Sequence, residues 1–223
     1  AIKEYLLTLR EQAIITNQNQ FNSAWWKGTP VGDDPDSIPN IVSATPTTGT
    51  IGGLSRVGNA YLQNGVYTTA ITDIGAEAGI AKIVELKALN AVGQSMADLI
   101  ILGTAVWAGL AGYLTTLRRY MNDEDMAKLG FEVIKLGDTI IMFENTQVLG
   151  GANTIVSNRM YGLNTKFLKL RQLTDPDVGA NGWSSQFERI GQKLNKAVYF
   201  NWFGNICTNT PRAHWVATSV STT

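Results

Sequence analysis

Two side chains in the sequence could serve a nucleophilic mechanism: a single cysteine, Cys207, and a single histidine, His214. A Ser-His-Asp or Cys-His mechanism would have to use His214, and the chain has no GxSxG nucleophile elbow to partner it. One cysteine excludes an intramolecular disulfide and a cysteine-based zinc site, and it fits a reducing compartment. We therefore expect His214 to be a surface or packing residue and Cys207 to be a small buried apolar group.

Carboxylates offer the other route to catalysis. Asp123, Glu124 and Asp125 form an acidic trio, and Glu144 lies at the end of a predicted strand. The trio follows two arginines at residues 118–119, so we interpret it as the start of the next helical turn, where acidic side chains suit the helix dipole. A small cytosolic hydrolase that uses Glu144 or the trio is the enzyme hypothesis that the sequence leaves open.

Two further segments could suggest a ligand. Asp33, Asp34 and Asp36 are grouped as in a calcium site, but the twelve-residue loop with its terminal Glu is missing, so we expect a solvated turn. Residues 40–53 are rich in Thr and Gly but have neither the Lys-Ser/Thr pair nor the strand-turn-helix frame of a phosphate site. We assign no catalytic, cofactor-binding or metal-ligating residue.

The charge balance excludes one class of partner. The chain has 223 residues, with 18 Lys+Arg against 18 Asp+Glu and a formal net charge of +0. A nucleic-acid reader that works through a basic face would carry a clustered positive excess. Only 16% of the residues are charged, against roughly 25% in an ordinary soluble domain. Much of the remainder is Thr, Asn, Gln and Gly, which suits surfaces that touch other protein.

The helices that would position these groups follow from apolar spacing. Helical periodicity over residues 1–21 is carried by Ile2, Leu6, Leu9 and Ala13. The apolar positions of this helix begin at Ile2, and no N-cap residue precedes them. The sequence also starts without a Met or a signal peptide, so we expect further sequence upstream. Prolines and glycines make residues 27–39 a linker or long loop, and a second helix is predicted over residues 77–96.

The most apolar stretch, residues 99–114, is shorter than the roughly 20 residues that a membrane span requires, and Gly103-Thr104 divides it. We predict a buried strand over residues 98–102, followed by a helix that Thr104 caps and that runs to about residue 120. Val106, Leu110, Leu114 and Leu117 then share one helix face.

The second half of the chain is dominated by β-strand patterns. Residues 131–136 and 139–143 form a predicted hairpin around Gly137-Asp138. Residues 161–164 and 167–170 are interpreted as a strand pair or one bent strand, and residues 196–207 as one strand. The order of elements predicts an α+β fold rather than regular βαβ alternation.

Several segments, taken in order, resemble a known family. They are residues 50–56 (TIGGLSR), 97–104 (ADLIILGT) with the helix that ends at 118–120 (RRY), 129–131 (LGF), 161–170 (YGLNTKFLKL) and 203–209 (FGNICTN). They are similar to the GGI-x-R, PD-strand-T-helix-RY, GF-hairpin, LNTKYLKL and GNL-x-x-x-N stretches of tailed-bacteriophage major capsid proteins with the Hong Kong 97-type fold. The sequence departs from that pattern at residues 60–64 and at Glu144-Asn145.

The resemblance implies a subunit with axial and peripheral domains. Residues 1–26 would be the end of the spine helix in the peripheral domain, and residues 27–153 would form the axial domain. Residues 154–203 would supply peripheral strands, and residues 204–223 would return to the axial domain. The N-terminal arm and extended loop are not expected in this chain, so no cross-linking residue is carried over.

The implied function is structural rather than enzymatic: self-assembly into an icosahedral shell that encloses phage or prophage double-stranded DNA. The implied partners are other copies in pentamers and hexamers, with scaffold, portal and decoration proteins, and no membrane or cofactor. Assembly would take place in the bacterial host cytoplasm and the product would be a virion. An encapsulin-like shell with a protein cargo is the alternative on the same fold.

Overall fold

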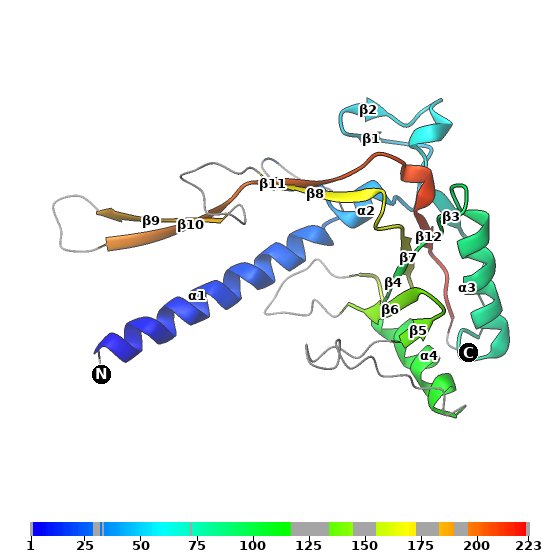
Figure 1. Ribbon diagram of the computed structural model, residues 1–223, viewed down its shortest axis with the longest axis horizontal. Helices are drawn as coiled ribbons and strands as arrows, with labels where there is room; N and C mark the ends of the chain where they lie inside the picture. The colour runs from blue at the N-terminus through cyan, green and yellow to red at the C-terminus, as the bar shows by residue number, and fades with distance from the viewer. Residues whose placement is uncertain are drawn as a thin grey trace.

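The computed structural model of the protein describes residues 2–28, 32, 34–71, 73–116, 134–144, 155–172, 183–189 and 196–221. Figure 1 shows a body of sheet and helices, from which helix α1 (Ile2–Trp25) and a two-stranded ribbon project in the same direction. We use the name ribbon for the strand pairs β8/β11 and β9/β10, within residues 168–172, 183–189 and 196–208. The acidic trio, residues 129–131 of the capsid-like motifs and the first residues of the predicted hairpin, 131–133, lie outside the described residues.

The other helices of the described part are short. They are α2 (Ile38–Ile41), α3 (Glu77–Leu89) and α4 (Thr104–Thr116), with two 3₁₀ turns, η1 (Ala60–Leu62) and η2 (Pro211–Ala213). The strands are β1 (Thr50–Ile51), β2 (Leu54–Ser55), β3 (Gly65–Tyr67), β4 (Leu99–Leu102), β5 (Ile134–Leu136), β6 (Thr139–Phe143), β7 (Met160–Leu163), β8 (Leu168–Gln172), β9 (Trp183–Arg189), β10 (Lys196–Trp202), β11 (Gly204–Thr208) and β12 (Trp215–Ala217).

A six-stranded mixed sheet forms the centre of the body, in the order β3-β12-β7-β4-β6-β5. The pairs β12/β3 and β4/β6 are parallel, and the remaining neighbours are antiparallel. Strands β4 and β6 therefore lie side by side, and α4 forms part of the connection between them. The predicted α+β class is confirmed.

One face of this sheet packs against α3 and α4. Ile100 and Leu102 of β4 lie in this first core with Trp215 of β12, Ile83 of α3 and Leu110 of α4. Side chains of a strand alternate between faces, and β4 buries both. A strand covered on both faces has a continuous apolar sequence, as Leu99 to Leu102 does.

The opposite face packs against the end of α1, α2 and the base of the ribbon. Ile101 of β4 and Tyr161 of β7 meet Trp26, Ile41 and Ile206 in this second core. The ring centroids of Trp26 and Tyr161 are 5.7 Å apart. The body therefore anchors both projecting elements through buried apolar contacts.

Helix α3 ends earlier than its apolar pattern predicts, at Leu89 instead of residue 96. The Nδ2 of Asn90 donates to the carbonyl of Leu86 at 2.8 Å, and Gly93 turns the chain with a φ of +63°. Val84, an apolar residue of this helix, is 50% exposed. A local cap and turn thus outweigh the continuing periodicity.

The other helix predictions hold with shifted boundaries. Helix α1 continues to Trp25, past the predicted end near residue 21, and α2 begins where only a loop was expected, with Ser37 as its N-cap. Helix α4 begins at Thr104 itself, and Val106, Leu110 and Leu114 of its predicted face are buried. Leu117, the fourth residue of that face, and the predicted helix end near residue 120 lie outside the described residues. None of the helices in the described ranges has the length and apolar character needed to cross a bilayer.

The hairpin of β5 and β6 is confirmed over its described residues, with Gly137 at a φ of +62°. Two other strand predictions are wrong. Strands β7 and β8 are neither a pair nor one strand, because β7 lies in the central sheet and β8 pairs with β11. Residues 196–207 divide at Phe203 into β10 and β11, and β10 pairs with β9, which the sequence analysis does not predict.

His214 joins the central sheet to the ribbon and is fully buried. Its Nδ1 accepts the backbone N–H of Asn164, which follows β7, at 3.1 Å. Its Nε2 lies 2.9 Å from the hydroxyl of Thr208, the last residue of β11. The packing interpretation of His214 is confirmed, and burial lowers its pKa to about 4 although Asp98 opposes this shift.

We expect acid to weaken the fold through His214. The unfolded chain protonates this histidine near pH 6.5 and the native protein only near pH 4, so the unfolded state binds more protons between these values. Protonation of His214 leaves the free energy of unfolding unchanged above pH 6.5 and lowers it by an amount that approaches about 3 kcal/mol below pH 4. Urea unfolding at pH 7 and pH 4 should therefore separate the wild type from His214→Gln, which keeps a donor and an acceptor without titrating. An equal loss of stability in both proteins would contradict this assignment.

A second test concerns the close packing of β7 under β12. A Cβ at Gly162 would lie 2.0 Å from Cε2 of the Trp215 indole. We expect Gly162→Ala to lower the unfolding free energy by about 3 kcal/mol, because the ring and sheet must separate. Gly112→Ala is the matched control: nothing lies within 4 Å of its added Cβ on α4, and the change should be neutral or stabilising by up to about 1 kcal/mol. Chemical denaturation of both variants measures the contrast, and similar effects at the two sites would refute it.

Candidate functional site

Glu144, the candidate catalytic carboxylate, lies directly after β6 and contacts helix α1. Its Oε1 accepts a hydrogen bond from Nδ2 of Asn22 at 3.0 Å, and its backbone N–H donates to the carbonyl of Leu102 at 3.1 Å. These bonds hold the end of α1 against the central sheet. The structure does not test a pairing with the acidic trio, which lies outside the described residues.

Of the three aspartates considered for calcium, Asp34 and Asp36 take part in contacts that fix the segment before α2, and Asp33 lies outside the described residues. Asp34 pairs with Lys27, while the carboxylate of Asp36 accepts hydrogen bonds from Asn40 at 2.9 Å and Asn205 at 3.1 Å. In the ranges that the structure describes, no cluster of three or more His, Cys, Asp or Glu side chains could hold a metal ion.

Cys207 is exposed, so the expectation of a buried thiol is wrong. Strand β11 covers the body with one face only: Ile206 points into the second core, and Cys207 points away from it. The Sγ of Cys207 lies 3.5 Å from the carbonyl of Lys169 on the paired strand β8.

The Thr- and Gly-rich segment forms a protrusion, which we define as residues 43–63. Strands β1 and β2 pair around Gly52 and Gly53, whose φ angles are +55° and +77°. Glycine adopts two successive positive φ angles without steric cost, as a two-residue hairpin turn requires. These glycines therefore serve a backbone turn.

Arg56, the arginine of the GGI-x-R-like motif, fixes the base of this protrusion. It is only 1% exposed, and its NH2 group donates to the carbonyls of Asn40 at 2.6 Å and Ile41 at 2.9 Å. Its NH1 group donates to Oδ1 of Asn64 at 3.3 Å. Burial lowers the pKa of the guanidinium, and these acceptors at the end of α2 stabilise its charge. The protrusion is therefore held in one orientation.

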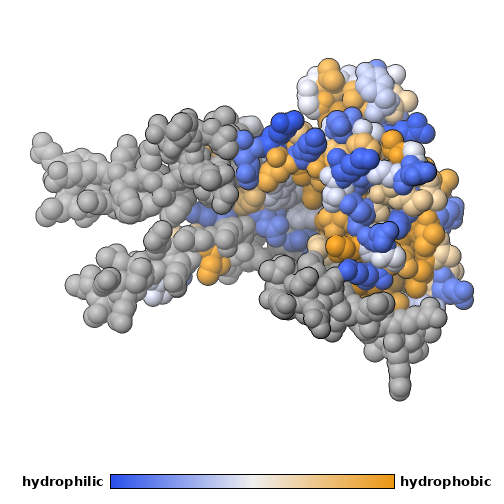
Figure 2. All heavy atoms as spheres, in the orientation of Figure 1, coloured by the Kyte–Doolittle hydropathy of each residue, from blue (hydrophilic) through white to orange (hydrophobic). Residues whose placement is uncertain are grey.

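The tip of the protrusion is apolar. Leu54, Val57 and Tyr61 are 58%, 66% and 67% exposed. In Figure 2 the protrusion stands at the top of the body and carries hydrophobic and neutral residues with little of the hydrophilic colour. A rigid, exposed apolar surface of this kind is typical of contacts with other protein.

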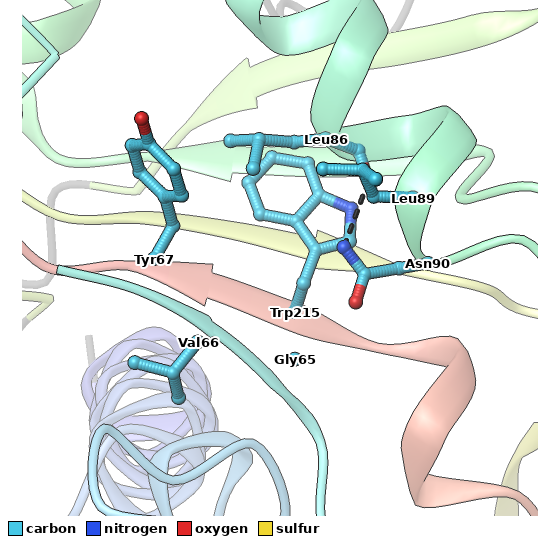
Figure 3. A pocket seen from close by; sticks show the side chains of 7 residues that line it. All are labelled: Gly65, Val66, Tyr67, Leu86, Leu89, Asn90 and Trp215. Carbon is cyan, nitrogen blue, oxygen red and sulfur yellow. Dashed lines mark hydrogen bonds between the residues drawn. The ribbon is translucent and has the colours of Figure 1, made fainter. Parts of the chain in front are cut away.

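A cavity of about 140 Å³ lies beside the protrusion, between α3 and the edge strand β3. Gly65, Tyr67, Leu86, Leu89, Asn90 and Trp215 line it (Figure 3). Within the described structure the buried Nε1 of Trp215 has no hydrogen-bond partner. No motif in the sequence predicts this cavity, because its lining residues come from three separate segments.

Comparison with known proteins identifies the fold. No protein-family model and no curated protein matches the sequence. Three solved structures each match 96% of the chain: a capsid chain of cyanophage A-1(L) (15% identity, TM-score 0.65), the SrpI encapsulin of Synechococcus elongatus PCC 7942 (12%, 0.52) and the capsid of an empty GTA particle (11%, 0.51).

These similarities cover 68%, 66% and 66% of the respective solved chains, so the chain spans about two thirds of their length. Identities this low support a statement about fold alone. The chain has the fold of tailed-phage major capsid proteins, the Hong Kong 97 type, as the order of its motifs predicts.

Proposed function

We propose that the chain is the major capsid protein of a tailed phage or prophage, a structural subunit that self-assembles into an icosahedral shell around double-stranded DNA. The observation that carries this proposal is the match to the cyanophage A-1(L) capsid chain over 96% of the sequence at a TM-score of 0.65. Because the chain spans about two thirds of that protein, the assembly of the whole particle belongs to the proposal.

The physical character of the surface supports this function. A net charge of +0 lets many copies associate without strong mutual repulsion. A charged fraction of 16% limits the desolvation cost of burying broad lateral faces. A shell can enclose DNA without binding it tightly, so it does not require a basic face.

The proposal includes a division of the chain. Residues 1–26 would end the spine helix of the peripheral domain, residues 27–153 would form the axial domain, residues 154–203 would supply peripheral strands, and residues 204–223 would return to the axial domain. Strand β7 (Met160–Leu163) is hydrogen-bonded between β4 and β12 in the central sheet. Within residues 154–203 we therefore propose that the peripheral part begins only after Leu163.

Self-association into pentamers and hexamers is the central partnership in this proposal. Scaffold, portal and decoration proteins would be the further partners, with assembly in the bacterial cytoplasm and release as a virion. The role is structural and non-enzymatic. The hydrogen bonds that Glu144 makes to Asn22 and Leu102 connect α1 to the central sheet, which suits a structural role better than the hydrolase hypothesis.

An encapsulin-like shell is the second candidate, supported by the match to the SrpI encapsulin at a TM-score of 0.52. The higher TM-score of the cyanophage capsid chain favours the phage assignment. Adjacent terminase and portal genes would support a phage capsid, whereas a neighbouring peroxidase or ferritin-like gene would support an encapsulin.

We expect the full-length gene product, expressed with its neighbouring genes, to form closed icosahedral particles. Electron microscopy of the sedimenting fraction measures this directly. Monodisperse monomers under every condition would contradict the proposed function. Nuclease-protected DNA inside the particles separates the phage capsid from a shell whose contents are protein.

A further inference from the structure

The cavity beside α3 contains a buried hydrogen-bond donor that lacks an acceptor in the described structure. Trp215 is 1% exposed, and its Nε1 has no partner. Asn90 does not satisfy it, because the Nδ2 of Asn90, which is a donor and bonds to the carbonyl of Leu86, faces the indole nitrogen while the amide oxygen points away (Figure 3). Figure 3 shows the indole beneath Leu86 and Leu89, with its nitrogen on the side of Asn90. An indole N–H can only donate, so the cavity calls for a group that brings an acceptor.

The size and lining of the cavity define that group further. A cavity of about 150 Å³ holds one benzene ring, and this one measures about 140 Å³. Leu86, Tyr67 and the indole face offer apolar contact, and Leu89 at the rim is 66% exposed. The fitting ligand is a single ring that carries one oxygen.

The same chain displays such a ring on its protrusion. Tyr61 is 67% exposed, and its side chain combines a ring with an oxygen. The neighbouring backbone is held in place, because Nδ2 of Asn59 donates to the carbonyl of Ser55 at 2.8 Å and Nε2 of Gln63 donates to the carbonyl of Arg56 at 2.9 Å. A side chain presented by a pre-ordered backbone docks at a lower cost in conformational entropy than one on a mobile loop.

Tyr61 and the cavity lie close enough in each copy for a chain of identical contacts to involve both. Only Gln63 and Asn64 separate η1, which carries Tyr61, from β3 at the cavity. Figure 1 shows the protrusion above the same side of the body on which β3 and α3 lie. A projection on one copy and a hole on the next make a heterologous contact, which closes into a ring when repeated by rotation.

We infer that Tyr61 of one copy inserts into the cavity beside Trp215 of the neighbouring copy, where its hydroxyl oxygen accepts the indole N–H. This inference rests on the proposed shell function and names one contact within it. Leu54 and Val57 surround the inserted ring and exclude water from the contact.

The first experiment uses the unassembled full-length protein and does not depend on shell formation. We would add p-cresol, which is the tyrosine side chain, or toluene, which lacks the hydroxyl, to protein with ¹⁵N-labelled tryptophan. The Trp215 indole signal is the one absent from Trp215→Phe. We expect p-cresol to shift it at several-fold lower concentration than toluene. Equal responses, or no response to either compound, would overturn the inference.

The second experiment measures the lowest protein concentration that yields particles, by light scattering. Tyr61→Ala should raise it at least tenfold, and Tyr61→Phe and Trp215→Phe about fivefold each. The double Tyr61→Phe/Trp215→Phe variant should be no worse than either single variant, since both remove the same bond. Val156→Ala, which trims a side chain that is 46% exposed and lies outside the protrusion, is the control and should assemble as the wild type does.

The outcomes separate the two proposals. If the wild type forms shells and Tyr61→Ala assembles at the same concentration, the tyrosine contact is wrong and the capsid function stands. If the wild type never assembles while p-cresol still binds selectively, the shell function fails and the cavity is a site for another phenolic group. Should Trp215→Phe fail to fold, Tyr61→Phe and Tyr61→Ala, changes at an exposed residue, still decide the matter.

Discussion

Burial of both faces of the six-stranded sheet is the constraint on which the rest of the structure depends. Strand β4 sends Ile100 and Leu102 to one core and Ile101 to the other, so neither face can meet water without loss of apolar burial. Helices α3 and α4 cover the first face. The end of α1, helix α2 and the base of the ribbon cover the second, which is how elements that project far from the body remain attached to it.

The attachment points are polar contacts between segments distant in sequence. His214 bonds to Asn164 and Thr208 where the sheet gives way to the ribbon, and Asn22 bonds to Glu144 where α1 meets β6. Such bonds contribute little stability individually, but a buried group left without its partner is costly. They therefore specify one orientation of ribbon and helix, and the proposed shell subunit would require such a uniform geometry.

The protrusion, too, is oriented by buried polar contacts. A buried arginine that bonds to the carbonyls of Asn40 and Ile41 presents an apolar tip in one orientation. Arg56 thereby makes this surface rigid. In the proposed shell, a contact that anchors one copy to the next would require such a rigid surface.

The sequence by itself determined the apolar runs, the glycine turns and the order of motifs, because these depend on residues close along the chain. The strand β4, the buried face of α4, the β5–β6 hairpin and the capsid fold were predictable for that reason. Only the tertiary structure decided which strands pair, that α3 ends at Asn90, that Cys207 points outward, and that Arg56, His214 and Trp215 meet the groups they do. Those outcomes depend on contacts between distant segments, and a side chain's pattern along the chain does not specify its neighbour across the core.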